Sequence, residues 1–356
     1  MKTGKTLVEL ATEIQRQAES KHDYIAPAQR LSMTVDENKT LLTMQNGTVK
    51  TYGIMQTAHE QIGQRLDIPR AYYERLLAGS WSDREMLAKN ANHWLEKSDA
   101  RFLVRTIDGS ARALLSDRYR PLDNYDLAES VLPKLISSGC QVESCELTDK
   151  RLYIKAVTPR ITAEVKKNDV VQMGMVITNS EIGLGAIKIE PMIYRLICLN
   201  GAIVNDMAMR KQHVGKRREF VELDNAEQYY TDRTRIADDN AFWLKVIDVV
   251  SAMIDETMFQ KIVTRWKDAT EQKITVGPVE IVERTAKRLV LSEGEKTSVL
   301  THLIQGGDLT AYGLMNAVTR SAQDVESYDR STDLERMGAG ILELPRSQWH
   351  EFAEVA

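Results

Sequence analysis

Positive charge is concentrated in one short stretch of the sequence, residues 207–220. Five lysines and arginines fall within nine residues there, with a histidine among them: Arg210, Lys211, His213, Lys216, Arg217 and Arg218. Guanidinium and ammonium groups at this density bind phosphate oxygens, with an affinity that depends on salt and not on base sequence. The stretch follows an apolar, strand-like run, so we expect it at the edge of a sheet, where it predicts a polyanion-binding surface. The alternative is a solvated loop between sheet and helix.

A second basic motif, Arg118-Tyr119-Arg120, lies between a strand-like run and the start of a predicted helix. A tyrosine between two guanidinium groups can stack on a base while its neighbours hold phosphate, which is how single strands are bound without sequence preference. The same residues fit a structural corner in which Asp117 and Asp123 pair with the arginines and the ring covers the sheet edge. The sequence does not decide between these two interpretations.

Arg195 is the one charged residue in the apolar run of residues 193–199. A charge that is removed from water needs a partner. Arg195 is therefore either part of a core ion pair or a groove residue that projects from the sheet and adds to the phosphate contacts.

Zinc binding has weak support. The sequence contains three cysteines, and together with one histidine they could supply four ligands: Cys140, Cys145, Cys198 and His213. Zinc modules normally show tighter paired spacings, so buried core thiols are the better interpretation.

A metal-dependent nuclease would need clustered carboxylates and a nearby lysine. Asp149, Glu164 and Lys166 are of the right types, but the last two fall in a polar loop between strands. We assign no catalytic residue, and we expect neither a metal nor a cofactor.

The charge balance of the whole chain hides a basic middle. The 356 residues carry a net charge of -4, yet residues 101–222 contain 19 Lys and Arg against 15 Asp and Glu. Sparse, unpaired cysteines suit a reducing compartment. The N-terminal residues lack the apolar core of a secretory signal, and no apolar stretch is long enough to span a bilayer. These features predict a cytoplasmic protein without a membrane segment.

Local patterns predict an α+β fold with a mostly antiparallel central sheet, N-terminal helices and a helical C-terminal region. Asn46-Gly47 and Asp108-Gly109 are dipeptides suited to tight hairpins, and short connections join the strands that follow. We expect four segments: an N-terminal arm at 1–30, a hairpin with helices at 31–100, a basic antiparallel core at 101–223 and the helical region at 224–356. The helix-like run in the arm has no clear partner in the sequence, so we expect the arm to be mobile.

Three separated phrases then suggest a family. They are RALLSDRYRPLDN at residues 112–124, YRLICLNGAI at 194–203 and TAYGLMNAVTRSAQDVESYD at 310–329. Together they resemble the phage/plasmid-like family called domain of unknown function 932, over roughly residues 47–344. The resemblance implies an origin in bacteriophages, prophages or conjugative plasmids, and it brings no assigned catalytic residues. Within the shared phrases, we expect Asn200-Gly201 to form a tight strand-to-helix turn.

These observations favour a non-enzymatic nucleic-acid-binding protein of a phage or plasmid in the bacterial host cytoplasm. We expect it to bind or anneal single-stranded DNA in recombination or replication, as a homo-oligomer. One alternative is an interaction protein that blocks a host factor or defence, in which the apolar stripe of residues 242–266 would be partly exposed. A metal-dependent nuclease is the weaker alternative.

Overall fold

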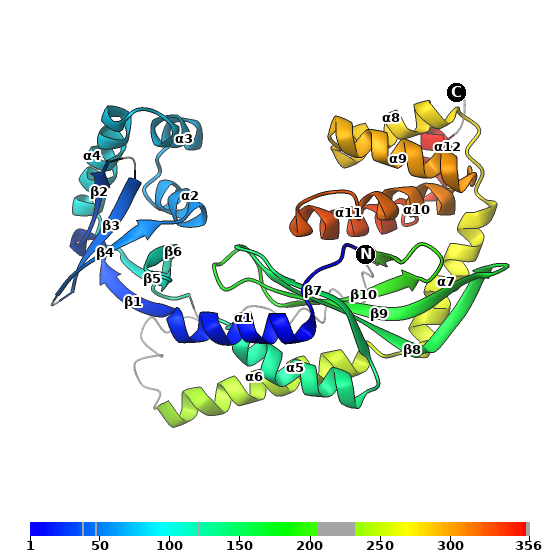
Figure 1. The fold of residues 1–356 in the computed structure, drawn as a ribbon, viewed down its shortest axis with the longest axis horizontal. Helices are drawn as coiled ribbons and strands as arrows, with labels where there is room; N and C mark the ends of the chain where they lie inside the picture. Colours follow the sequence, from blue (N-terminus) through cyan, green and yellow to red (C-terminus); the bar gives the residue numbers. More distant parts are fainter. Residues whose placement is uncertain (38, 47, 120, 205–231, 354–356) are drawn as a thin grey trace. The chain divides into compact units, whose positions relative to one another are not determined.

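The computed structural model describes residues 1–37, 39–46, 48–119, 121–204 and 232–353. Within these ranges the chain forms two compact units, each built on its own sheet (Figure 1). The six-strand unit comprises residues 12–125 and 180–185, and the five-strand unit comprises residues 1–11, 126–179 and 186–356. Helices and largely antiparallel strands occur in both, which confirms the expected α+β class.

The six-strand unit consists of an open sheet with helices on one face. Its strands are β1 (His22–Pro27), β2 (Leu31–Asp36), β3 (Lys39–Asn46), β4 (Thr48–Ile54), β5 (Arg101–Ile107) and β6 (Ser110–Ser116), in the spatial order β1-β5-β6-β4-β3-β2. Among the described strand pairs of this unit, only the short β4–β6 contact is parallel. A 3-10 turn, η1 (Ala28–Arg30), joins β1 to β2, and the helices are α2 (Gln56–Arg65), α3 (Arg70–Ala78) and α4 (Trp81–Lys97).

Alternating burial explains how this sheet and its helices pack. Leu42 and Met44 lie on one face of β3, and they pack with Ile62 of α2 and Leu87 of α4. The expected hairpin at Asp108-Gly109 is confirmed, because both residues adopt the left-handed conformation that such a turn requires (φ 48° and 72°).

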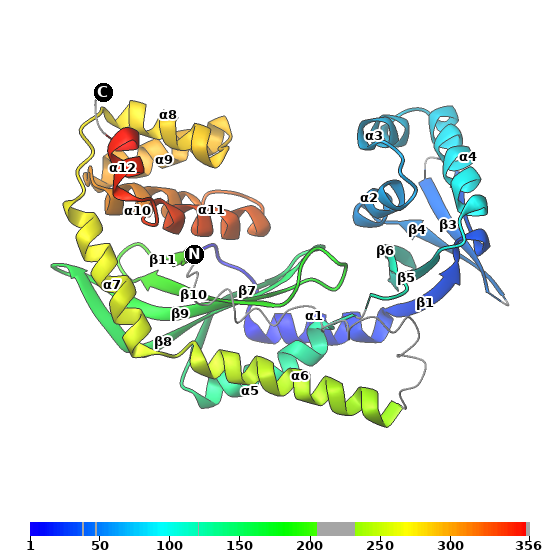
Figure 2. The ribbon, with the colours of Figure 1, turned by 180° about the vertical axis from the view of Figure 1, so that it is seen from behind.

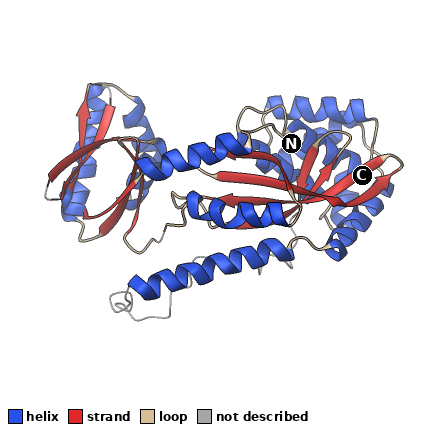
Figure 3. Cartoon of the chain, turned by 60° about the horizontal axis from the view of Figure 1, so that its bottom comes forward, coloured by secondary structure: helices blue, strands red, loops and turns tan. Residues whose placement is uncertain are grey.

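The five-strand unit is built on an antiparallel sheet in the order β11-β10-β9-β8-β7. Its strands are β7 (Gln141–Leu147), β8 (Leu152–Lys166), β9 (Asp169–Asn179), β10 (Lys188–Arg195) and β11 (Asn200–Ile203). Its helices are α5 (Asn124–Ser137), α6 (Asp232–Ala252), α7 (Glu256–Glu271), α8 (Pro278–Leu289), α9 (Glu293–Gly306), α10 (Ala311–Ser321), α11 (Tyr328–Ile341) and α12 (Arg346–Ala353). Figure 2 shows α5 and α6 on one face of this sheet and α10 and α11 on the other, and Figure 3 draws the strands of both sheets in red and the helices in blue.

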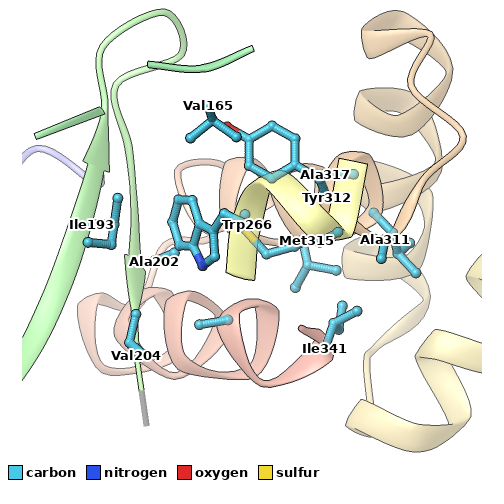
Figure 4. Packing of buried hydrophobic residues seen from close by; sticks show 14 of the residues in the cluster. Val165, Ile193, Ala202, Val204, Trp266, Ala311, Tyr312, Met315, Ala317 and Ile341 are labelled. Atoms are coloured by element: carbon cyan, nitrogen blue, oxygen red, sulfur yellow. The ribbon is translucent and has the colours of Figure 1, made fainter. Parts of the chain in front are cut away.

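The main core of this unit lies between the sheet and helices α7 to α11. Figure 4 shows Ile193 and Val165 of the strands facing Trp266 of α7 and Tyr312 of α10. The Trp266 and Tyr312 ring centroids are 5.9 Å apart. Ser292 and Glu295 form the capping box that starts α9.

The structure differs from several local expectations. Residues 32–44 alternate as one strand would, yet they form two strands, β2 and β3, because the chain turns at Glu37 (φ 50°). Asn200-Gly201 does not lead into a helix: both residues begin β11, which pairs back onto β10. The expected core at 101–223 is divided, since β5 and β6 pair with β1 and β4, and not with the strands after residue 140.

The N-terminal residues are held in place, contrary to the expectation of a mobile arm. The backbone amide of Lys5 donates a 2.8 Å hydrogen bond to the Cys145 carbonyl of β7. Leu10 and Ile14 of α1 (Leu7–Ser20) are buried. The arm therefore has the packing partners that its sequence alone does not reveal. None of the helices in the described ranges combines the length and apolarity needed to cross a bilayer.

Candidate nucleic-acid interface

The basic stretch at residues 207–220 follows directly on an edge strand. β11 ends at Ile203, and it is one of the two edge strands of the five-strand sheet. Six predicted phosphate contacts lie outside the described residues: Arg210, Lys211, His213, Lys216, Arg217 and Arg218. Arg120 lies outside them as well.

Arg195 is part of an ion pair in the core, which was the first of the two interpretations of this residue. Its guanidinium donates two hydrogen bonds of 2.7 Å to the two carboxylate oxygens of Asp169, which is buried. The hydroxyl of Tyr312 donates a third hydrogen bond to this carboxylate, and the Arg195 guanidinium lies 5.7 Å from the centre of that ring. Burial lowers the pKa of Arg195, but the hydrogen bonds to Asp169 and the charges around the guanidinium together raise it above its ordinary value. Arg195 thus holds β10 to β9 and α10.

The turn between β10 and β11 is fixed by polar contacts from α10 and the residues after it. The amide of Asn200 donates a 2.6 Å hydrogen bond to the hydroxyl of Thr319, and both side chains are buried. The amide of Gln323 donates to the carbonyls of Cys198 and Leu199, at 3.1 Å each. Leu199 adopts a left-handed conformation (φ 52°), which is uncommon for a bulky residue. The chain is therefore well fixed at the point where it leads into β11.

Tyr119 lies in a structural corner of the six-strand unit. Its ring is half-buried beside Leu115 and Ile182, and its hydroxyl donates a 3.3 Å hydrogen bond to the Ser180 carbonyl. Burial raises the pKa of the phenol. Arg118 is exposed. This placement matches the corner interpretation better than a ring that is open to a base.

A buried ion network holds Asp123, one of the two acidic residues expected at that corner. Arg105 donates 2.8 Å hydrogen bonds to Asp123 and Asp23, and Lys21 lies 2.5 Å from the second oxygen of Asp123. Arg112 donates a 2.6 Å hydrogen bond to the buried Glu181. Burial raises the pKa of Asp123. The contacts with Arg105 and Lys21 lower it by a larger amount, so the net shift of the pKa is downward.

The described residues give no support to metal chemistry. No group of three or more His, Cys, Asp or Glu side chains among them could hold a metal ion. Cys140 and Cys145 are buried, and burial raises the pKa of the Cys145 thiol to about 11. Lys166 pairs with Asp308 at 2.7 Å. His213, the fourth suggested zinc ligand, lies outside the described ranges.

Sequence reasoning missed a different group of aromatic and basic residues. His22 and Tyr24 of β1 and Lys50 and Tyr52 of β4 gather at the rim of the six-strand sheet, with the two tyrosine ring centroids 6.2 Å apart. The sequence does contain a repeated pattern that could have indicated this group, because each strand carries a basic or imidazole side chain two residues before a tyrosine. That both pairs meet in space depends on the fold.

The comparisons with known proteins identify a family and no individual relative. The family model described as Domain of unknown function (DUF932) matches residues 112–339, from β6 to α11. No curated protein and no solved structure matches the chain. Because the model covers more than half of the sequence, including all five strands of the five-strand sheet, the chain belongs to the family of domain of unknown function 932.

Proposed function

We propose that this protein binds single-stranded nucleic acid, preferably DNA, and holds or anneals strands during the recombination or replication of a phage or plasmid. In this proposal it acts as a homo-oligomer in the cytoplasm of the bacterial host. The observation that carries the proposal is the density of cations at residues 210–218, immediately downstream of the edge strand β11.

The contrast with the described cations supports this interpretation. Arg105, Arg112 and Arg195 are each paired with a carboxylate, at distances of 2.6 to 2.8 Å. Their charges are used inside the fold, so they are poor candidates for phosphate contacts. In the proposal, the backbone of the strand is instead bound by the residues of the basic stretch, through contacts that do not read the bases.

Neither alternative function gains a specific observation in its favour. The apolar stripe that an interaction protein would expose is mostly buried: Phe242, Val246 and Val250 of α6, and Phe259, Ile262 and Trp266 of α7. A nuclease would need a carboxylate cluster, and the described residues contain none that could hold a metal.

A salt series tests the proposal. Binding of the unmodified protein to a labelled single strand and to a duplex is measured from low to physiological salt, with and without Mg²⁺. We expect the affinity for the single strand to be higher and to fall steeply with salt, since each neutralised phosphate contributes a slope of about -0.7 in log K against log salt. Absence of binding at low salt would contradict the proposal, and Mg²⁺-dependent cleavage would favour the nuclease.

A further inference from the structure

Two strands of the six-strand unit carry the same arrangement of side chains. His22 and Tyr24 are two residues apart in β1, and Lys50 and Tyr52 are two residues apart in β4. Because side chains alternate along a strand, the members of each pair lie on the same face of the sheet. Ala26 continues that face in β1 and is buried in the core. The pairs therefore lie where the core face meets solvent.

The two pairs come together although their strands are not neighbours. β5 and β6 lie between β1 and β4, which would separate them by about 14 Å in a flat sheet. The Tyr24 and Tyr52 ring centroids are nevertheless 6.2 Å apart with an interplanar angle of 36°, so the two side chains meet across β5 and β6. The His22 ring centroid lies 6.3 Å from that of Tyr24. The three rings and Lys50 form what we call the tyrosine patch.

Lys50 supplies an exposed cation to the tyrosine patch. Its ammonium nitrogen lies 4.7 Å from the centre of the Tyr24 ring and 3.3 Å from the Tyr24 hydroxyl oxygen. Within the described residues, no carboxylate lies in ion-pairing range of this ammonium. Hydrogen bonds from Tyr52 and then from Lys50 lower the pKa of Tyr24, while burial raises that of Tyr52 to about 12. Both tyrosine side chains are half-buried, and Lys50 is exposed.

The chemistry of the tyrosine patch suits one unpaired nucleotide. Every base has a flat π face that stacks on an aromatic ring without regard to sequence, and a nearby ammonium can hold the phosphate. An exposed cation–π contact contributes less binding free energy than a base stacked on an aromatic ring does. A base can therefore displace the Lys50 ammonium from the Tyr24 ring, and the ammonium can then move to the phosphate.

We propose that His22, Tyr24, Lys50 and Tyr52 form a second contact site for single-stranded nucleic acid, in which the tyrosine rings stack on a base and Lys50 binds the adjoining phosphate. This inference rests on the proposed function for its ligand, but it concerns other residues than the basic stretch after β11. It assigns to Tyr24 and Tyr52 the stacking role that the sequence suggested for Tyr119.

Two substitutions separate the stacking from the charge. Affinities are measured for an oligothymidylate and for a strand of the same length that lacks bases, with Tyr24→Leu, Lys50→Gln and the unmodified protein. The matched control is Tyr72→Leu, because Tyr72 of α3 is also half-buried and has a guanidinium, that of Arg75, 5.5 Å from its ring centre.

We expect Tyr24→Leu to weaken binding of the oligothymidylate by roughly tenfold or more, and to leave binding of the strand without bases almost unchanged. Lys50→Gln should weaken binding of both strands. It should also reduce the slope of log K against log salt by about the amount that one phosphate contact contributes. Tyr72→Leu should bind as the unmodified protein does. If Tyr24→Leu binds both strands as Tyr72→Leu does, the tyrosine patch is not a binding site.

The outcomes distinguish this inference from the proposed function. If the unmodified protein binds neither strand at low salt, both proposals fail. If it binds, and Lys216→Ala with Arg217→Ala and Arg218→Ala removes binding while Tyr24→Leu has no effect, only the inference about the tyrosine patch fails.

A second measurement keeps the inference testable if Tyr24→Leu does not fold. The unmodified protein is crosslinked by light to a strand containing 5-iodouracil, and the modified peptides are identified by mass spectrometry. We expect crosslinks at Tyr24, Tyr52 or His22. Crosslinks confined to other parts of the chain would overturn the assignment.

Discussion

Two lysines of this protein make the same contact with a tyrosine in very different surroundings. In the five-strand unit, the ammonium of Lys155 lies 4.7 Å from the centre of the Tyr328 ring, and in the six-strand unit that of Lys50 lies 4.7 Å from the centre of the Tyr24 ring. Lys155 is fully buried and pairs with Glu335 at 2.5 Å, whereas Lys50 is exposed. The comparison teaches that the surroundings of a cation, more than its nearest aromatic ring, indicate whether it serves the fold or a ligand.

The largest expected effect comes from breaking the buried pair. Lys155→Met leaves the Glu335 carboxylate unpaired in the core, which should lower the free energy of unfolding by about 3–5 kcal/mol. Combining it with Glu335→Leu removes both charges and should recover most of this loss. Urea unfolding of both variants and of the unmodified protein measures these changes in the free energy of unfolding.

Lys50→Gln is the control for that prediction, because its side chain is exposed and should change the free energy of unfolding by less than about 0.5 kcal/mol. If Lys155→Met were as mild as Lys50→Gln, the distinction between a structural and an exposed lysine would not hold.

Acid should destabilise the six-strand unit through a buried histidine. His59 lies between the hydroxyls of Thr40 and Tyr73, at 2.8 Å from each, and burial lowers its pKa to about 4. The unfolded chain binds this proton near pH 6.5, so it holds more protons than the folded chain between pH 6.5 and 4. The stability of the unit should therefore fall over this window, by on the order of 3 kcal/mol in total.

Urea unfolding at pH 7 and at pH 4.5 measures this fall. His59→Gln, which lacks the titrating ring, should show a smaller change between the two pH values. His22→Gln, which removes the exposed imidazole of the tyrosine patch, should keep the full fall. A pH dependence that survives in His59→Gln would point to another group.

A smaller effect is expected at the turn that leads into β11. Thr319→Val removes the 2.6 Å hydrogen bond from the buried Asn200 amide, which should cost about 1–3 kcal/mol. The matched control is Thr43→Val, because the 3.2 Å contact of Thr43 with Thr51 is exposed and should contribute little. Equal stabilities of the two variants would show that the turn is not held by this contact.

The parts of the fold that the sequence predicts are those with local causes. Asp108-Gly109 allows positive φ at two adjacent residues, and Ser292 caps α9 together with Glu295, which lies three residues further along the chain, so both features could be recognised from neighbouring residues. The parallel contact of β4 with β6 joins residues far apart in the chain. No local pattern specifies it, which is why the division into two sheets was not predicted.

The candidate site shows the same limit. The excess of cations at residues 210–218 is a property of composition, and it is visible without a structure. The partner of Arg195 is not, because Asp169 becomes its neighbour only through the pairing of β9 with β10. Likewise, the spacing of His22 with Tyr24 and of Lys50 with Tyr52 is visible, but the contact between the two pairs depends on the strand order of the sheet.

The most direct test of the central claim is the salt dependence of single-strand binding when Lys216, Arg217 and Arg218 are replaced together by alanine. The matched control removes three exposed positive charges from another region, with Lys261→Ala, Lys267→Ala and Lys273→Ala. We predict that the first variant binds more weakly and with a shallower slope of log K against log salt, by about 0.7 for each lost contact, while the control keeps the slope of the unmodified protein. Equal slopes for all three proteins, with the variants folded, would contradict the account.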